Sequence, residues 1–117
     1  MSNKVFVVDD DPSFLRFVSL VLTNNDKTVT LFSSGKGVME EIRNQKPKLI
    51  FLDVNLPDES GIKLCERIKL RHPKIKVILF SDCSETIGCS KTSTFGADVF
   101  LPKPFSVEQL SSLLEFH

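Results

Sequence analysis

The sequence predicts an α/β fold in which helices cover a doubly wound sheet of five parallel strands. Three observations support this prediction. The apolar pattern alternates five times between strand-like and helix-like segments along 117 residues,. Several strand-like segments are continuously apolar, as expected for strands buried on both faces. No linker-like or low-complexity stretch separates the segments, so we expect residues 1–117 to form one domain,.

The first strand and the first helix are predicted from adjacent segments. Lys4 to Val8 is a short, β-branched run that ends at three consecutive acids, as expected for a buried strand. Asp11 can then cap a helix, and Pro12 suits its first position. The helix follows from apolar residues at helical spacing, namely Phe14, Leu15, Phe17, Val18, Val21 and Leu22,.

The second and third strands differ in polarity. Thr28 to Phe32 alternates polar and apolar residues, which is typical of an edge strand. The third strand, Lys48 to Val54, is an apolar run between two prolines and carries Asp53 near its end,. Between these strands, a helix over Gly35 to Gln45 is predicted from the apolar stripe of Val38, Met39 and Ile42,.

The second half of the chain repeats the alternation. Ser60 to Arg71 predicts a helix that ends before Pro73, and Ile75 to Phe80 predicts a buried strand,. The fourth helical segment, Glu85 to Phe95, is rich in Ser, Thr and Gly. These residues form helices poorly, so we expect a frayed or mobile segment there.

The last predicted elements are a strand over Val99 to Leu101 and a helix over Ser106 to Phe116, which opens on a capping-box pattern of Ser106 and Gln109,. Short connections and right-handed crossovers then give a doubly wound open sheet, for which we expect the strand order 2-1-3-4-5. Ligands bind such sheets beyond the carboxyl ends of the strands, where the winding reverses. For this order, the reversal lies between the first and third strands.

Three acids are predicted to meet at this point, because Asp9 and Asp10 follow the first strand and Asp53 ends the third. Like charges about 4 Å apart repel by roughly 4 kcal/mol at an effective dielectric constant near 20. Mg²⁺ would compensate, because it takes oxygen ligands and one or two protein carboxylates. Lys103 after the last strand would add a further positive charge. The alternative is that Asp10 and Asp11 serve only as caps and turn residues.

Composition disfavours several functions. Fifteen Lys and Arg balance fifteen Asp and Glu, so no general basic field favours direct binding of nucleic acid or of an anionic membrane. The three cysteines lack CxxC or zinc-ligand spacing, which favours reduced thiols. The N-terminal apolar run Val5 to Val8 is too short for a signal peptide,. We therefore expect a cytoplasmic protein with neither nucleic-acid nor membrane partners.

Four segments stand at successive strand ends: VFVVDDDP, LIFLDVNLPDESG, VILFS and GADVFLPKPF. Together they resemble the signature blocks of the response-regulator receiver domain of two-component signal transduction, the family that includes chemotaxis regulators. The resemblance covers nearly the whole chain, with the blocks in the family's order. It implies a flavodoxin-like fold with the strand order given above.

The resemblance implies a phosphorelay function. Asp53 would be the phosphoacceptor, taking a phosphoryl group from a phosphohistidine of a sensor histidine kinase or phosphotransfer protein. Asp10, Asp53 and the backbone carbonyl of Asn55 would bind Mg²⁺ directly, with Asp9 acting chiefly through a coordinated water. Mg²⁺ and Lys103 would neutralise the equatorial phosphoryl oxygens. The protein would not be a conventional enzyme, but it would catalyse its own phosphorylation and dephosphorylation.

The resemblance also implies a conformational switch. Ser81 would donate a hydrogen bond to the phosphoryl group, and Phe100 matches the aromatic position that changes rotamer in the family. The face built from the fourth helical segment, the fifth strand and the last helix would then bind a downstream protein target. Because the fourth segment forms a helix poorly, we expect this face to be plastic.

Asp82 departs from the family pattern, in which a small residue at this position lets the phosphodonor approach. Its size and negative charge should slow phosphorylation. Cys83 and Asn55 occupy further positions that modulate the lifetime of the phosphoryl group in the family. Asp82 therefore leaves open a second function, a receiver-like protein-interaction module that does not depend on phosphorylation.

Two other functions fit the residues less well. A metal-dependent phosphohydrolase would need a second aspartate two residues after Asp53, where this chain has Asn55. An FMN-binding flavodoxin would need a turn rich in hydroxyl groups and glycine after the first strand, where this chain has acids. We expect no effector domain after Phe116 and His117, so the chain is either a lone receiver or a piece of a longer regulator.

Overall fold

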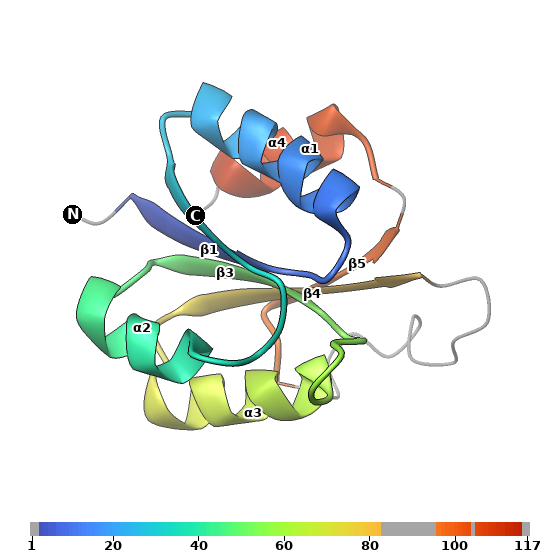
Figure 1. Ribbon diagram of the computed structural model, residues 1–117. Helices are drawn as coiled ribbons and strands as arrows, with labels where there is room; N and C mark the ends of the chain where they lie inside the picture. The colour runs from blue at the N-terminus through green and yellow to red at the C-terminus, as the bar shows by residue number, and fades with distance from the viewer. Residues whose placement is uncertain (1–2, 83–95, 104, 116–117) are drawn as a thin grey trace.

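The computed structural model describes residues 3–82, 96–103 and 105–115. Within these ranges, a parallel sheet lies between two layers of helices (Figure 1). The elements in chain order are β1 (Lys4–Val8), α1 (Pro12–Asn24), β2 (Thr28–Phe32), α2 (Val38–Gln45), β3 (Leu49–Asp53), α3 (Gly61–Arg71), β4 (Lys76–Asp82), β5 (Val99–Lys103) and α4 (Val107–Glu115).

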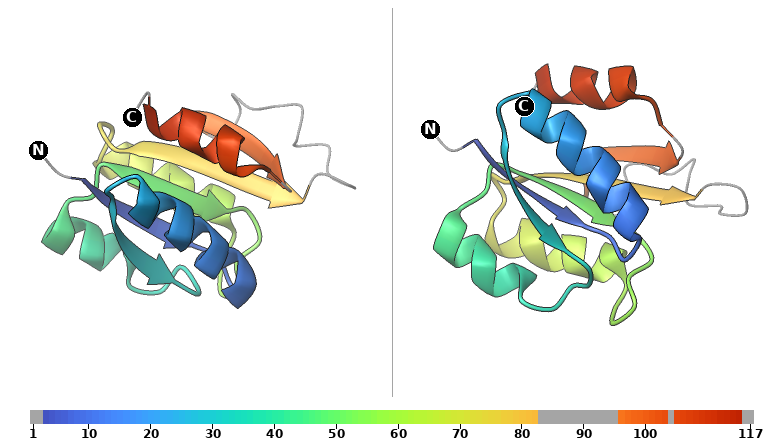
Figure 2. Two further views of the ribbon diagram at one scale, coloured as in Figure 1. Left: turned by 90° about the horizontal axis from the view of Figure 1, so that it is seen from above. Right: turned by 45° about the horizontal axis from the view of Figure 1, so that its top comes forward.

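The sheet confirms the predicted topology. Its strand order is β2-β1-β3-β4-β5, and all neighbouring strands are parallel. α1 and α4 cover one face of the sheet, and α2 and α3 cover the other (Figures 1 and 2). β2 lies at one edge, as its alternating sequence predicts, and β5 lies at the other,.

Each central strand divides its side chains between two hydrophobic cores. In β3, Ile50 and Leu52 pack with residues of α2 and α3, whereas Leu49 and Phe51 pack with residues of α1 and α4. β1 and β4 alternate in the same way. A register shift of one residue would exchange these two sets, so burial on both faces fixes the register. The carboxyl ends of β1, β3 and β4 are therefore held in one arrangement.

Side chains cap three of the described helices. Asp11 caps α1 and Ser60 caps α3, each by accepting a hydrogen bond from the backbone N–H two residues later. Before α4, the Ser106 N–H donates to Gln109 Oε1 at 2.8 Å, and the Gln109 N–H donates to Ser106 Oγ at 3.1 Å. The predicted Asp11 cap and the predicted capping box are both present.

The helix predicted from Gly35 begins three residues later, at Val38. Gly37 adopts a left-handed conformation with φ of 83°, which stops a helix from extending toward the N-terminus,. The Gly35 N–H instead donates to the Asp58 carboxylate at 2.9 Å. The predicted helix start is therefore wrong, because a contact with the β3–α3 connection holds these residues in a turn.

Strand bounds also differ at the sheet edge. β5 extends beyond the predicted Leu101 to Lys103 and includes Pro102, which lacks a backbone N–H. An edge strand tolerates proline because one side of its backbone needs no hydrogen bond. β4 likewise extends to Asp82. The helix predicted over Glu85 to Phe95 lies outside the described residues.

Candidate functional site

The acids that follow β1 occupy two different environments. Asp9 is 1% exposed, whereas Asp10 is exposed. Asp9 Oδ1 accepts the Asp11 N–H at 2.9 Å, and Asp9 Oδ2 accepts from Lys103 Nζ at 2.8 Å. Both oxygens of the buried carboxylate are thus engaged by the protein, whereas Asp10 faces solvent.

Asp53 is the last residue of β3 and is 5% exposed. Its Oδ1 accepts the Asn55 N–H at 3.2 Å, and its Oδ2 lies 3.7 Å from Lys103 Nζ. This second contact is longer than the 2.8 Å contact between Lys103 and Asp9. Asp53 therefore carries a carboxylate oxygen that the protein holds less tightly than either oxygen of Asp9.

The three acids meet at the point where the winding of the sheet reverses, as the strand order predicts. One carboxylate oxygen from each of Asp9, Asp10 and Asp53 lies within 4.8 Å of the other two. A cluster of hard oxygen donors with one exposed member suits Mg²⁺, which binds one or two carboxylates and keeps several waters. The donor set present here therefore fits the metal expected from the sequence.

The electrostatic environment of Asp53 also favours a bound cation. Its pKa is raised from its ordinary value to about 6. Burial is the largest cause, and the negative charge of Asp9 adds to it, as does that of Asp10 more weakly. The Lys103 ammonium and the Asn55 N–H lower the pKa but do not offset these three effects,. The charged form of Asp53 is therefore incompletely compensated by the protein groups.

Lys103 reaches the acids from the end of β5 across aromatic rings. Its Nζ lies 4.2 Å from the centroid of the Phe14 ring and 5.0 Å from that of Phe80. The rings of Phe14 and Phe80 and the carboxylates of Asp9 and Asp53 together restrict where the Lys103 ammonium can lie,. Phe14 is a site residue that sequence reasoning missed, because its place in the apolar stripe of α1 marked it only as a core residue.

Ser81 lies in β4, the strand that pairs with β3, whereas Phe100 lies in β5, one strand farther from Asp53. Ser81, near the end of β4, is 1% exposed and pairs in register with Pro102 of β5. Phe100 is 7% exposed and belongs to the core on the α2 and α3 side. The backbone of Asp82 pairs with Lys103. The side chain of Asp82, and Cys83, lie outside the part of the chain that is described.

The connection after Asp53 is held by backbone contacts. Asn55 forms an antiparallel bridge with Ser60, and the Gly61 N–H donates to the Val54 carbonyl at 2.7 Å. A Cβ built on Gly61 would lie 1.8 Å from the carbonyl oxygen of Asp53. Only glycine permits this approach, so Gly61 positions Asp53 and Asn55. The sequence alone does not reveal this contact, because it joins Gly61 to a strand end eight residues earlier.

Comparison with known proteins agrees with the resemblance found in the sequence. Residues 5–115 match the family model of the response regulator receiver domain. The chain is 32% identical over 111 residues to the DNA-binding transcriptional regulator NtrC of Escherichia coli K12, a match that covers 95% of this chain and 24% of that protein. The chain thus spans about a quarter of the length of this relative.

Solved structures share the fold over nearly the whole chain. The receiver domain of DrrB, described as BeF3 activated, is 34% identical with a TM-score of 0.87, covering 99% of this chain and 97% of that one. A CheY-like receiver domain protein from Methanospirillum hungatei JF-1 is 22% identical with a TM-score of 0.88, covering 99% and 93%. Among the described helices, none has the length and apolar character needed to cross a membrane.

Proposed function

The chain belongs to the response regulator receiver domain family of two-component systems, and from this premise we propose that Asp53 is its phosphoacceptor. The observation that carries the proposal is the unequal engagement of the two buried acids. Lys103 Nζ lies 2.8 Å from Asp9 but 3.7 Å from Asp53. Asp53 therefore offers the less occupied oxygen for bond formation with phosphorus, while Asp9 anchors the lysine.

In the proposed reaction, Asp53 Oδ2 forms a bond to the phosphorus of a phosphohistidine on a partner protein. The P–N bond of the donor breaks, and its electron pair stays on the imidazole. Lys103 Nζ then lies close enough to neutralise a phosphoryl oxygen, because it already faces Asp53. We infer that the donor is a sensor histidine kinase or a phosphotransfer protein in the cytoplasm.

The same acids would hold Mg²⁺, which supplies positive charge to the phosphoryl oxygens when bound. We propose Asp10, Asp53 and the backbone carbonyl of Asn55 as direct ligands, with Asp9 acting through a water. Asp10 is exposed and can exchange solvent for a metal without breaking a described contact. The Asn55 backbone is restrained by its bridge to Ser60.

We further propose that phosphorylation is transmitted through Ser81 and Phe100. Ser81 stands next to Asp82 at the carboxyl end of β4, where its hydroxyl can donate to a phosphoryl group on Asp53. A movement of Ser81 would displace β5 as well, because β4 and β5 are paired, with Ser81 opposite Pro102 and Phe100 opposite Leu79. The face that includes β5 and α4 would then bind the downstream protein target.

The test is phosphorylation by acetyl phosphate with Mg²⁺, followed by intact mass spectrometry. The parent chain should gain one phosphoryl group and Asp53→Asn should gain none. Asp58→Asn is the matched control, because it removes an acid from the same connection without touching the cluster. No gain in the parent, even with a histidine kinase present, would contradict the proposal and favour the phosphorylation-independent interaction module.

A further inference from the structure

A groove of about 700 Å³ lies at the other end of the strands from the acids. It is bounded by the end of α2 and by the connection between α3 and β4. Its apolar floor includes Ile42, which is 1% exposed, Ile75, which is 8% exposed, and the buried Pro47. The groove is large enough for several side chains of a bound segment.

The wall formed by the α3–β4 connection is fixed in place. Lys69 Nζ, reaching from α3, donates to the Pro73 carbonyl at 3.1 Å and to the Ile75 carbonyl at 2.9 Å. The same ammonium pairs with Asp98 Oδ2 at 2.9 Å, and Asp98 also accepts the Val77 N–H at 2.8 Å. The groove is thus formed before any ligand arrives, which lowers the entropic cost of binding.

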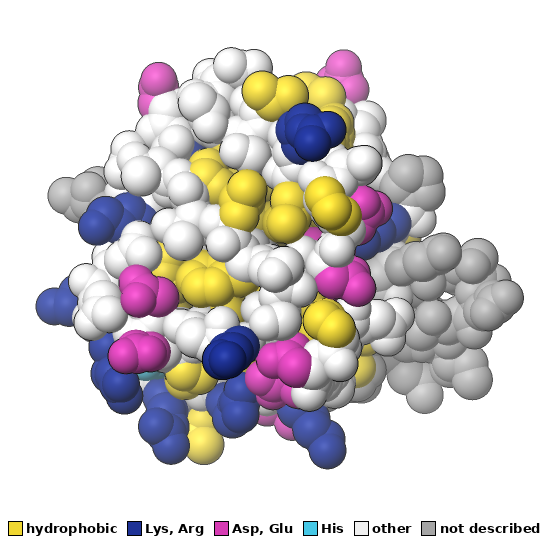
Figure 3. All heavy atoms as spheres, viewed as in Figure 1, with side chains coloured by type: hydrophobic (Ala, Val, Ile, Leu, Met, Phe, Trp, Pro, Cys, Tyr) yellow, Lys and Arg dark blue, Asp and Glu magenta, His cyan; other side chains and the backbone are white. Residues whose placement is uncertain are grey.

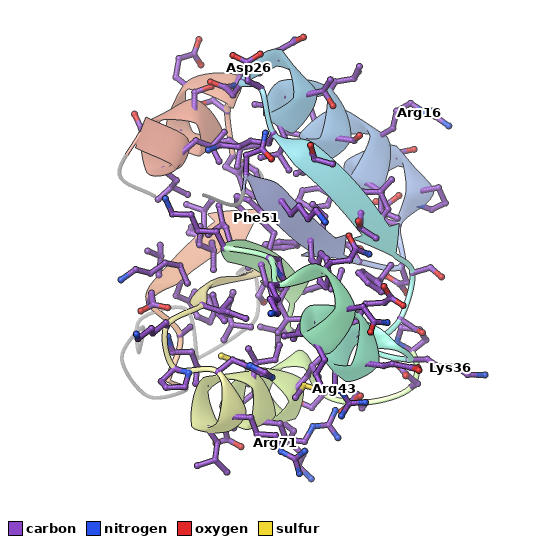
Figure 4. All side chains as sticks on the ribbon, turned by 90° about the vertical axis from the view of Figure 1, so that its left-hand side faces the viewer. Arg16, Asp26, Lys36, Arg43, Phe51 and Arg71 are labelled. Carbon is purple, nitrogen blue, oxygen red and sulfur yellow. The ribbon has the colours of Figure 1, made fainter. Side chains whose placement is uncertain are left out.

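The rim of the groove is cationic. Eight of the fifteen Lys and Arg residues come from two segments, 43–48 and 67–76, which contain no Asp or Glu. Arg43, Lys46 and Lys74 line the groove and are exposed. In the part of the chain that is described, no ion pair involves them. Figure 3 shows most of the visible Lys and Arg side chains around α2 and α3, and Figure 4 shows Arg43 and Arg71 on this side.

Favourable interaction with helix dipoles explains the positions of only some of these Lys and Arg residues. Cations favour helix C-termini, which explains Arg43 and Arg71 in the last turns of α2 and α3,. Lys48, Lys74 and Lys76 lie outside both helices, where β3 and β4 begin. Their charge stabilises neither helix end directly, and it remains available to attract an anionic partner.

The shape and chemistry of the groove select among anionic partners. Its apolar floor is recessed, so Ile42 and Ile75 cannot enter a bilayer, and a ligand must insert its own apolar groups. Apart from His72, its lining residues contain no ring on which a nucleic-acid base could stack,. An acidic protein segment with apolar side chains on one face can pack these side chains against the apolar floor and pair its carboxylates with the cationic rim.

We propose that this groove, defined by Ile42, Pro47 and Ile75 and rimmed by Arg43, Lys46 and Lys74, binds an acidic amphipathic segment of a partner protein. The apolar side chains of that segment fill the groove, and its carboxylates face the rim. This docking site is separate from the acid cluster, so it does not depend on phosphorylation of Asp53. Charge complementarity is the reason for choosing an acidic partner.

The test uses a fluorescein-labelled peptide of about 14 residues, with Leu at helical spacing and Glu on the other face. Fluorescence anisotropy should show saturable binding of one peptide per chain below about 1 mM. Backbone amide NMR shifts should fall on residues 42–47 and 72–75. A peptide with every Leu replaced by Ser should bind at least about tenfold more weakly, because it cannot fill the apolar floor.

Charge-reversed variants give the matched comparison. The double variant Lys46→Glu, Lys74→Glu should weaken binding at least about tenfold, whereas Lys36→Glu, Lys63→Glu, with the same change in net charge, should weaken it less than about threefold. The proposal would be overturned by lack of saturable binding, equal binding of a scrambled peptide, or shifts that map elsewhere. Concentration-dependent dimerisation through the groove would also overturn it, because the occupant would then be a second copy of the chain.

Discussion

Gly61→Ala tests how closely α3 approaches the end of β3. A Cβ at this position would lie 1.8 Å from the Asp53 carbonyl oxygen and 2.9 Å from the Val54 Cα, both backbone atoms of a central strand or its extension. These atoms cannot move aside as a flexible side chain would. The N-terminus of α3 must therefore shift, which also stretches the 2.7 Å hydrogen bond from the Gly61 N–H to the Val54 carbonyl.

The expected loss of stability follows from three effects. Overpacking costs about 1–3 kcal/mol, and weakening one backbone hydrogen bond costs about 1 kcal/mol. Alanine in a helix offsets about 1 kcal/mol of this, because it is the better helix former. The net destabilisation should be about 2 kcal/mol, which lowers the melting temperature of a domain this size by about 8 °C. Thermal denaturation followed by circular dichroism measures it.

Ser60→Ala is the matched control for function. It removes the Oγ that accepts the Ile62 N–H at 3.2 Å, costing about 1 kcal/mol, but adds no atom near Asp53,. Phosphorylation by acetyl phosphate should slow more in Gly61→Ala than in Ser60→Ala, at a temperature where both are folded. A Gly61→Ala variant as stable as the parent would refute the argument from close approach. The stability would then be explained without a steric clash between the alanine Cβ and the Asp53 carbonyl.

Three further predictions concern charge. Partial burial alone would raise the pKa of Asp98, but the Val77 N–H and the Lys69 ammonium lower it overall. The resulting stabilisation is present above the unfolded pKa and is lost as the pH falls through the lower folded pKa. Asp98→Asn should therefore cost about 1 kcal/mol in urea denaturation at pH 7, because Asp98 is exposed and solvent screens its ion pair with Lys69,. A difference in the free energy of unfolding between parent and variant that failed to narrow below about pH 4 would contradict this. Millimolar Mg²⁺ should raise the melting temperature, and Asp10→Asn should reduce that rise; an unchanged midpoint in the parent would count against the metal site. Asp82→Ala should speed phosphorylation by acetyl phosphate, and equal rates for the two proteins would reject the idea that Asp82 hinders donor entry.

The fold was predictable because its signals are local. β1 and β2 have the predicted bounds, since each is a run that one local pattern defines. The start of α2 was not predictable, because the Gly35 N–H is held by Asp58, 23 residues away. The extension of β5 through Pro102 was not predicted either. Proline suits a strand only at an edge, and the edge position of β5 depends on how the whole sheet assembles,. Errors thus occur where a distant contact overrides local preference.

The acid cluster was predictable because topology, not local contact, brings it together. Asp9 directly follows β1, Asp53 ends β3 and Lys103 ends β5. Parallel strands place their carboxyl ends at one edge of the sheet. What the sequence could not supply is the support around them. Phe14 beside Lys103 and Gly61 against Asp53 are recognisable only once α1 and α3 are packed on the sheet.

Net charge hides a polarity that runs along the strands. The total is zero, yet acids gather where β1 and β3 end, and cations gather where β3 and β4 begin. β3 has five residues, so its two ends are about 15 Å apart. That separation is roughly two Debye lengths at physiological ionic strength. Charge added at Asp53 is therefore largely screened at the groove.

This separation gives a last prediction, which rests on the proposed groove. Phosphorylating Asp53 replaces a carboxylate by an acyl phosphate and so adds about one negative charge, whose screened effect at the groove is below about 0.4 kcal/mol. Affinity for the acidic peptide should therefore change less than about twofold between the phosphorylated and unphosphorylated chain, measured by anisotropy. A change of tenfold or more would exceed what screened charge can produce. It would require a conformational change carried from β4 to the α3–β4 connection, and the two sites would then be coupled rather than independent.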